Sequence, residues 1–193
     1  MHSHLSESAT KPIHATETPP KVKGWPTRWC TKDQLQQYYL PLHKTGWNID
    51  NLPDSAQVLA LAKTFPMADL QSVRRFIAQV DKLADEEKHH PHRMLLCNNG
   101  PNSHTVTFTI LTHSATPFTK ESGERPPSGL GAGVTQRDIR LAVLIESLYV
   151  DQYSTGHVES AGTATAAMMD SDLRELDSFT QQVKQFEEYI KAI

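Results

Sequence analysis

Cysteine is scarce in this sequence, and neither sign of charge is in clear excess. The two cysteines, Cys30 and Cys97, have no paired spacing, which excludes a disulfide framework and a cysteine-rich zinc site and is typical of a reducing compartment. The formal net charge is -3 at pH 7, and Lys and Arg do not gather in any stretch, so the basic footprint of a nucleic-acid-binding protein is missing. We therefore expect a cytoplasmic protein that does not bind nucleic acid directly.

Long hydrophobic runs are also missing. No apolar stretch approaches the roughly 20 residues that a membrane-spanning helix needs, and the N-terminus lacks the apolar centre of a secretion signal. The 193 residues, 38% of them hydrophobic, suit one modest globular domain with some unstructured length. Residues 1–24 carry almost no large apolar side chain, so we expect them to form a disordered arm.

Local signals near the start of the ordered chain predict a helix and a hairpin. Thr31 and Gln34 have the spacing of a capping box, which predicts a helix that begins at Thr31 and ends near residues 41–46. Residues 47–49 and 58–65 are typical of extended segments. The turn-forming sequence DNLPDS lies between them, and together they predict an antiparallel hairpin.

The clearest helical periodicity lies in ADLQSVRRFIAQVDKLADEEK, residues 68–88. Its apolar stripe consists of Leu70, Val73, Phe76, Ile77, Val80, Leu83 and Ala84. Asp69 is the expected N-cap, and Pro91 is expected to end the helix because it cannot continue the hydrogen-bond ladder. This interpretation leaves His89 and His90 at the C-terminal edge of the helix.

Sequence patterns in the second half of the chain predict two strands and two helices. Residues 94–97 are a candidate strand, and HTVTFTILTH alternates apolar and polar residues, which predicts a half-buried strand ending at His113. Residues 114–133 are rich in Pro, Gly and Ser and form a long connection. A helix is expected from Thr135, and an amphipathic helix over residues 173–190. This order predicts an α+β fold, with helices covering one face of an antiparallel sheet.

The sequence KHHPH, residues 88–92, places three imidazoles within four positions. Asp85 precedes His89 by four residues on the same helix face, so its carboxylate could orient that imidazole. The residue pattern alone leaves solvated surface, metal binding and acid–base catalysis open. A metal set would draw on His89, His90, His92 or His113 with Asp85, but no HExxH or CxxC partner supports it. Acid–base work suits imidazole, which titrates near pH 7.

Three stretches in order, DKLADEEKHHPH, TFTILTH and GVTQRDIRLAVLIESL, resemble the pterin-4a-carbinolamine dehydratases. That family's pattern is an acidic residue, three residues, His-His-Pro, a strand ending Thr-His, and Gly-Leu-Ser/Thr-x-x-Asp at the start of a helix. LPLHKTGW and LAKTFPMADLQSVRRFIAQV extend the similarity upstream, so that it runs from about Thr31 to Leu148. The ordered combination of three motifs is specific to the family, whereas His-His-Pro alone is not.

The resemblance implies a single α+β domain with a four-stranded antiparallel sheet and helices on one side. We assign this domain to residues 25–150, with an insertion at 114–133, and a linker and extra C-terminal helix to 151–193. The implied reaction is the dehydration of 4a-hydroxytetrahydropterin to quinonoid dihydropterin, which recycles tetrahydrobiopterin after aromatic amino acid hydroxylation. The resemblance further implies a pterin substrate, no metal or organic cofactor, and a homo-oligomer, either a dimer or a tetramer.

By the same resemblance, the pterin-site histidines are His89, His90 and His113. We assign His89 and His113 to proton transfer, and His90 to binding the ring and orienting the leaving hydroxyl. Asp85 and Asp138 match the acidic positions of the motifs and are assigned to positioning imidazoles.

Some positions depart from the family pattern. Arg93 and Cys97 stand where the family has aromatic residues, and Asp85 is shorter than the usual glutamate. His92 falls outside the pattern, and we expect it to be solvated surface.

A second class of function also fits the fold. Animal members of the family serve as dimerisation cofactors of a homeodomain transcription factor, so this chain could be a non-catalytic, protein-binding adaptor that also enters the nucleus. The intact set of three histidines favours the enzyme, because an adaptor has no physical need for them.

Overall fold

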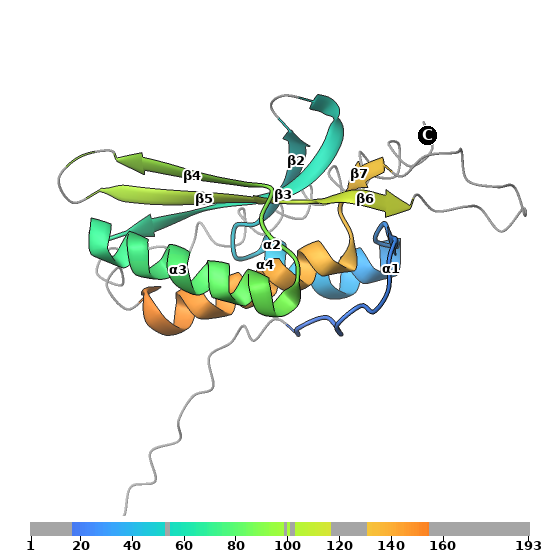
Figure 1. Cartoon of the computed structure of the whole chain (residues 1–193), viewed down its shortest axis with the longest axis horizontal. Helices are drawn as coiled ribbons and strands as arrows, with labels where there is room; N and C mark the ends of the chain where they lie inside the picture. Colours follow the sequence, from blue (N-terminus) through green and yellow to red (C-terminus); the bar gives the residue numbers. More distant parts are fainter. Residues whose placement is uncertain (1–16, 53–54, 99, 101–102, 117–130, 155–193) are drawn as a thin grey trace, which may run out of the picture.

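The computed structural model describes residues 17–52, 55–98, 100, 103–116 and 131–154 (Figure 1). Most of the predicted arm, most of the 114–133 insertion and the predicted helix over residues 173–190 lie outside these residues. None of the helices in the described part of the chain is both long enough and apolar enough to span a membrane.

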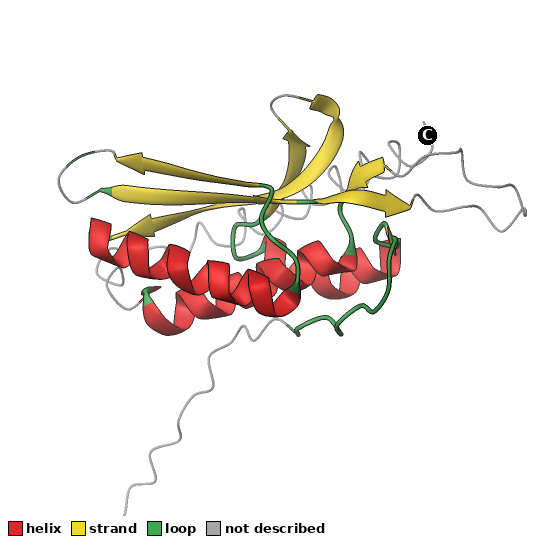
Figure 2. Cartoon of the chain, in the orientation of Figure 1, coloured by secondary structure: helices red, strands yellow, loops and turns green. Residues whose placement is uncertain are grey.

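The main sheet is antiparallel and has four strands in the order β2-β3-β5-β4. The strands are β2 (Asn48–Leu52), β3 (Ser55–Met67), β4 (Arg93–Asn98) and β5 (His104–Ile110). Figure 2 shows the helices gathered on one side of this sheet. The predicted α+β fold, with a four-stranded antiparallel sheet covered on one face, is confirmed. The hairpin predicted from DNLPDS is also confirmed, because β2 pairs with β3.

The first helical segment runs through α1 (Lys32–Gln34), the π-helical turn η1 (Leu35–Tyr39) and α2 (Leu40–His43). The capping box is present, because the Gln34 N–H donates to Thr31 Oγ1 at 3.1 Å and the Thr31 N–H donates to Gln34 Oε1 at 3.0 Å. These two bonds satisfy donors that a helix start would leave open. The predicted start at Thr31 is confirmed. The predicted end near residues 41–46 is also confirmed, because α2 ends at His43.

Helix α3 (Leu70–Glu87) lies along the sheet (Figure 1). Asp69 caps it as predicted and accepts the Ser72 N–H at 2.7 Å. It ends just before His89 and His90, as predicted, but the cause differs: Lys88 adopts a left-handed conformation at φ 52° and the His89 N–H donates to Ala84 O at 3.0 Å. This left-handed cap ends the helix before Pro91 can restrict the chain.

The hydrophobic core lies between the sheet, α3 and α4 (Gln136–Gln152). Phe65 on β3 is its aromatic centre, and its ring centroid lies 4.9 Å from Tyr149, 5.3 Å from Phe76, 5.8 Å from Trp47 and 6.0 Å from Phe108. Three of these four contacts are edge-to-face, the arrangement that aromatic quadrupoles favour. The core therefore fixes both helices against the sheet.

A second sheet of three short strands was not predicted. It contains β1 (Thr27–Arg28), β6 (Thr112–Thr116) and β7 (Gly131–Gly133) in the order β1-β6-β7. The predicted strand ending at His113 is therefore divided, since β5 ends at Ile110 and His113 belongs to β6. The change of partner explains the break: β5 pairs with β3 and β4, whereas β6 pairs with β1 and β7.

Residues 17–24 belong to the arm that the sequence predicts to be disordered, but they contact the helices. Pro19 O accepts from Arg140 Nη1 at 2.6 Å, and Pro20 O accepts from Gln136 Nε2 at 3.0 Å. Lys21 Nζ donates to Glu86 O at 2.8 Å. These contacts are made by polar side chains and main-chain carbonyls, which a prediction from apolar content does not take into account.

Candidate active site

His89 follows the left-handed cap of α3, and its imidazole contacts the first turn of α4. Its Nε2 lies 2.7 Å from Oδ1 of Asp138. The side chain of His89 is 12% exposed and that of Asp138 is 0% exposed. The two residues are 49 positions apart in the sequence, so this pair joins the end of α3 to the start of α4.

Asp138 is held by a dense set of donors. Its Oδ2 accepts from the Thr135 N–H at 2.6 Å, the Thr135 hydroxyl at 2.7 Å and the Thr112 hydroxyl at 2.9 Å. With Oδ2 occupied, Oδ1 accepts from His89. A carboxylate can only accept, so His89 must donate from Nε2. That leaves Nδ1, which no described residue hydrogen-bonds, as the nitrogen that can exchange a proton with a ligand.

Cys30 lies fully buried close to the same carboxylate. Burial, with a smaller contribution from the charge of Asp138, raises the pKa of the Cys30 thiol well above its usual range. The thiol therefore stays protonated at neutral pH and is a poor nucleophile.

Two arginines on α4 hold the end of α3 in place. Arg140 donates to both carboxylate oxygens of Glu87, from Nε at 2.9 Å and from Nη2 at 3.0 Å. Arg137 Nη2 donates to Lys88 O at 3.2 Å. These contacts fix the turn that carries His89 against the helix that carries Asp138.

The Glu87–Arg140 pair predicts a pH-dependent stability. The hydrogen bond from Arg140 lowers the pKa of the Glu87 carboxyl. Its stabilisation is therefore complete above the unfolded pKa of about 4.3 and is lost as pH falls through the lower folded value. Glu87→Gln should lose about 1 kcal/mol of unfolding free energy at pH 7, and this loss should become smaller at about pH 3, as measured by urea denaturation.

The control for this prediction is Glu86→Gln. Glu86 faces Lys82 at 4.0 Å, and both side chains are exposed, 62% and 80% respectively. Exposed pairs contribute little to stability, so this variant should resemble the wild type at both pH values. A loss for Glu87→Gln that is the same at both pH values would contradict the assignment to the ion pair.

His113 contacts His92, which the sequence analysis assigned to solvated surface. His92 is exposed, as predicted, but its Nδ1 lies 3.1 Å from Nε2 of His113, and the ring centroids are 4.8 Å apart. The hairpin of β4 and β5 explains the contact, because His92 precedes the first strand and His113 follows the second. The start of the first strand and the end of the second lie side by side in an antiparallel hairpin, so the two strands predicted from the sequence could have indicated that His92 and His113 are close.

His90 pairs with the aspartate that we expected to orient its neighbour. Its Nε2 lies 3.3 Å from Oδ1 of Asp85, and the two side chains are 60% and 76% exposed. The predicted orientation of His89 by Asp85 is wrong, because the left-handed Lys88 turns His89 away from the helix face that carries Asp85. Asp138 orients His89 instead.

The three pairs are His89–Asp138, His90–Asp85 and His92–His113. No hydrogen bond or ring contact among the described residues joins one pair to another. They still share one region, because Cα atoms three residues apart, such as those of His89 and His92, are separated by at most about 10 Å. Thr112, which donates to Asp138, is the sequence neighbour of His113. Within the described ranges, no three His, Cys, Asp or Glu side chains are arranged to hold a metal ion.

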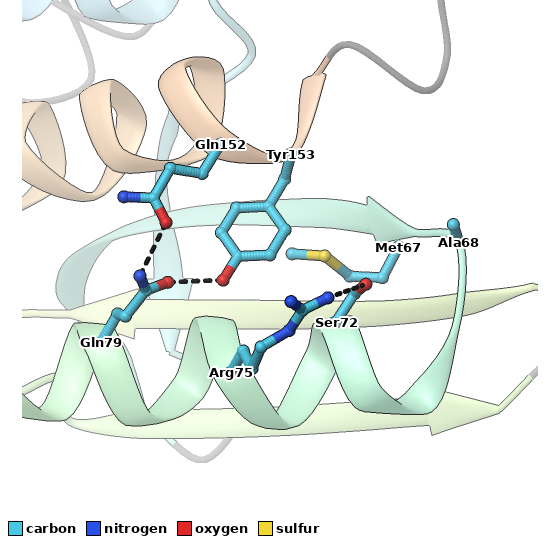
Figure 3. Close-up of a pocket in the computed structure, with 7 residues that line it drawn as sticks. All are labelled: Met67, Ala68, Ser72, Arg75, Gln79, Gln152 and Tyr153. Atoms are coloured by element: carbon cyan, nitrogen blue, oxygen red, sulfur yellow. Dashed lines mark hydrogen bonds between the residues drawn. The ribbon is translucent and has the colours of Figure 1, made fainter.

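A separate hollow of about 300 Å³ lies at the opposite end of α3 (Figure 3). It is lined by Met67, Ala68, Ser72, Arg75, Gln79, Gln152 and Tyr153. Its polar groups bond to one another: Gln79 Nε2 donates to Gln152 Oε1 at 2.6 Å, and the Tyr153 hydroxyl donates to Gln79 Oε1. At 1.5 Å per residue, the helix separates Ser72 from His89 by about 25 Å. The hollow offers neither an imidazole nor a carboxylate, so the histidine pairs are the better candidate for proton transfer.

Comparison with known proteins gives a family for the chain. Residues 28–148 match the model of the family described as pterin 4 alpha carbinolamine dehydratase. No curated protein matches the chain. The matched span begins in β1, ends in α4 and contains the four strands of the main sheet and all three side-chain pairs.

Proposed function

Because the chain belongs to the pterin 4 alpha carbinolamine dehydratase family, we propose that it dehydrates a 4a-hydroxytetrahydropterin to quinonoid dihydropterin by histidine acid–base chemistry. The observation that carries this proposal is the imidazole of His89 fixed by the buried Asp138. In this role the protein would recycle tetrahydrobiopterin after aromatic amino acid hydroxylation.

The reaction needs one proton added and one removed. The 4a-hydroxyl must be protonated as the C4a–O bond breaks, so that it leaves as water. The N5–H proton must also leave, and the electron pair of that bond forms the C4a=N5 double bond. An imidazole can do either step at neutral pH, protonated for the first and neutral for the second.

We assign the proton transfers to His89 and His113. Protonated at Nδ1, His89 gives its proton to the leaving hydroxyl, while Asp138 stabilises the charged imidazole. His113 is exposed in β6 and takes the N5 proton. His90, with a side chain that is 60% exposed, binds the pterin and orients the hydroxyl.

The two aspartates act as positioning residues of unequal weight. Asp138 is buried and fixes the tautomer and direction of His89. Asp85 is 76% exposed and orients His90 through a 3.3 Å contact. Solvent screens an exposed pair, so Asp85 contributes the smaller part.

We further propose that the catalytic domain is residues 25–150, that the insertion 114–133 and residues 151–193 are additions to it, and that the protein acts in the cytoplasm as a homo-oligomer. Support for the oligomer comes from the edge strand β4, where Met94, Leu95 and Leu96 are 36%, 44% and 46% exposed. An edge strand with exposed apolar side chains is a surface for association. The adaptor function has no need for a buried aspartate that orients a histidine, and we do not propose it.

The direct test generates the 4a-carbinolamine in situ with an aromatic amino acid hydroxylase and follows the formation of quinonoid dihydropterin. Adding the protein should increase the rate above that of spontaneous dehydration. A rate equal to the spontaneous one would contradict the proposed function.

The site assignment is tested by removing imidazoles one at a time. His90→Ala and His113→Ala should each lower kcat about 10- to 100-fold, because both are exposed and water replaces them in part. Lys82→Ala, an exposed change on α3, is the control and should keep the wild-type rate. Full activity in both histidine variants would move the site elsewhere in the chain.

A further inference from the structure

We propose that His92 is the proton-relay partner of His113, which receives the substrate proton from His113 and passes it to solvent. This inference rests on the proposed dehydratase function and adds a fourth histidine to it. His92 lies outside the family pattern, so the similarity alone gives it no role.

The geometry of the two rings carries the inference. His92 Nδ1 and His113 Nε2 are 3.1 Å apart, and the rings meet at 61°. A hydrogen bond between two imidazole nitrogens needs one donor and one acceptor, so the two rings share a single proton along this line. His113 Nδ1 and His92 Nε2 form no hydrogen bond with any described residue. One end of the pair is thus open to a ligand and the other to water.

The proton path follows from this arrangement. The N5–H proton moves to Nδ1 of His113, and its electron pair forms the C4a=N5 bond. His113 then gives its Nε2 proton to Nδ1 of His92, and His92 releases its own Nε2 proton to water. The hydroxyl leaves as water with the proton from His89, which is protonated again from solvent. One pterin and one water are formed, with no other reactant. Once the pterin has left, Nδ1 of His113 loses its proton to water, His92 returns its Nδ1 proton to Nε2 of His113, and Nε2 of His92 takes a proton from water, which restores both rings.

Electrostatics favours release along the pair. Two imidazolium rings with centroids 4.8 Å apart would repel each other, so a proton gained by one ring favours loss of a proton from the other. His89 has no such outlet, because its Nε2 is fixed on the buried Asp138. In the site, the Nε2 of His89 is therefore occupied by Asp138, whereas the Nε2 of His113 leads to solvent through the ring of His92.

Two variants of His92 separate relay from orientation. In His92→Asn, the amide can reach the position of Nδ1 and keep the bond to His113, but it cannot pass a proton on. In His92→Ala, both the bond and the relay are lost, and the space of an imidazole is left open. His92 is exposed, so both variants should fold, as checked by circular dichroism.

The experiment measures kcat and KM in the carbinolamine assay at low concentrations of a non-imidazole buffer, because concentrated buffer would accept the proton directly. Both variants should lower kcat about 10-fold with little change in KM, a modest loss because water also reaches the exposed His113. Added imidazole should restore His92→Ala but not His92→Asn, whose amide fills the space.

Other results would overturn the relay in distinct ways. Wild-type kcat in His92→Asn would mean that His92 only orients His113. Unchanged kcat in both variants would remove His92 from the mechanism while leaving the dehydratase function intact. Loss in His92→Ala without rescue by imidazole would also contradict proton transfer. A wild-type protein with no activity would instead overturn the proposed function, and the relay with it.

Discussion

Replacing Asp138 with asparagine is expected to lower the dehydration rate about 100- to 1000-fold, as much as removing His89 itself. The carboxylate accepts four hydrogen bonds, three at Oδ2 and one at Oδ1. An asparagine amide has only one oxygen. If that oxygen faces His89, the amide N–H2 faces the Thr135 N–H; if it faces Thr135, the N–H2 faces Nε2 of His89. Either orientation opposes a donor to a donor or forces His89 into the wrong tautomer.

The matched control is Asp85→Asn, which makes the same chemical change at an aspartate that is 76% exposed and 3.3 Å from His90. We expect its rate to fall less than about threefold, because solvent screens the pair. Both variants should be assayed well below their melting temperatures, since the buried Asp138 also caps α4. Equal losses in the two variants, or a wild-type rate in Asp138→Asn, would contradict the separate roles.

The parts of the fold that the sequence predicted are those that depend on near neighbours. The caps at Thr31, Asp69 and Thr135 are formed by side chains that bond to groups two or three residues away. The apolar periodicities of α3 and β5 also repeat within a few residues. Caps and periodicities depend on residues close together in the sequence, so the starts of helices and the buried faces of helices and strands could be predicted without a structure.

The pairing inside the site could not be obtained in that way. Spacing along an ideal helix assigned Asp85 to His89, but one left-handed residue, Lys88, ends that spacing just before the histidine. The true partner, Asp138, lies 49 residues away on another helix. The resemblance supplied Asp138 as a site residue, yet only the folded chain assigns it to one imidazole.

The second sheet was missed for a related reason. Its strand β7 is Gly131–Gly133, and glycine-rich sequence is typical of loops. Here glycine is required by packing, since a Cβ at Gly133 would lie 2.5 Å from Nε1 of Trp29. β1 and β6 lie far apart in the sequence, with Thr27 paired to Ala115, and no local sequence pattern predicts such a pairing. Because this sheet carries Thr112 and His113, part of the site rests on an element that only tertiary structure reveals.

Replacing Phe65 with alanine should produce the largest loss of stability, about 3–5 kcal/mol in the free energy of unfolding. Phe65 is 0% exposed on a central strand, and four rings surround it. These are Trp47, Phe76, Phe108 and Tyr149. Truncation removes the transfer free energy of the ring and leaves a cavity that these rigid neighbours cannot fill.

Urea denaturation followed by circular dichroism measures this loss. The control is Val150→Ala, since Val150 is 48% exposed on α4 and its truncation should change stability by less than about 1 kcal/mol. If Phe65→Ala does not fold, Phe65→Leu keeps most of the volume and should lose about 1–2 kcal/mol. A loss for Phe65→Leu no greater than that for Val150→Ala would mean that Phe65 is not the centre of the core. The ring of Phe65 contacts other aromatic core residues and none of the three side-chain pairs of the site. Phe65→Leu should therefore lower stability while keeping kcat near that of the wild type wherever the protein remains folded.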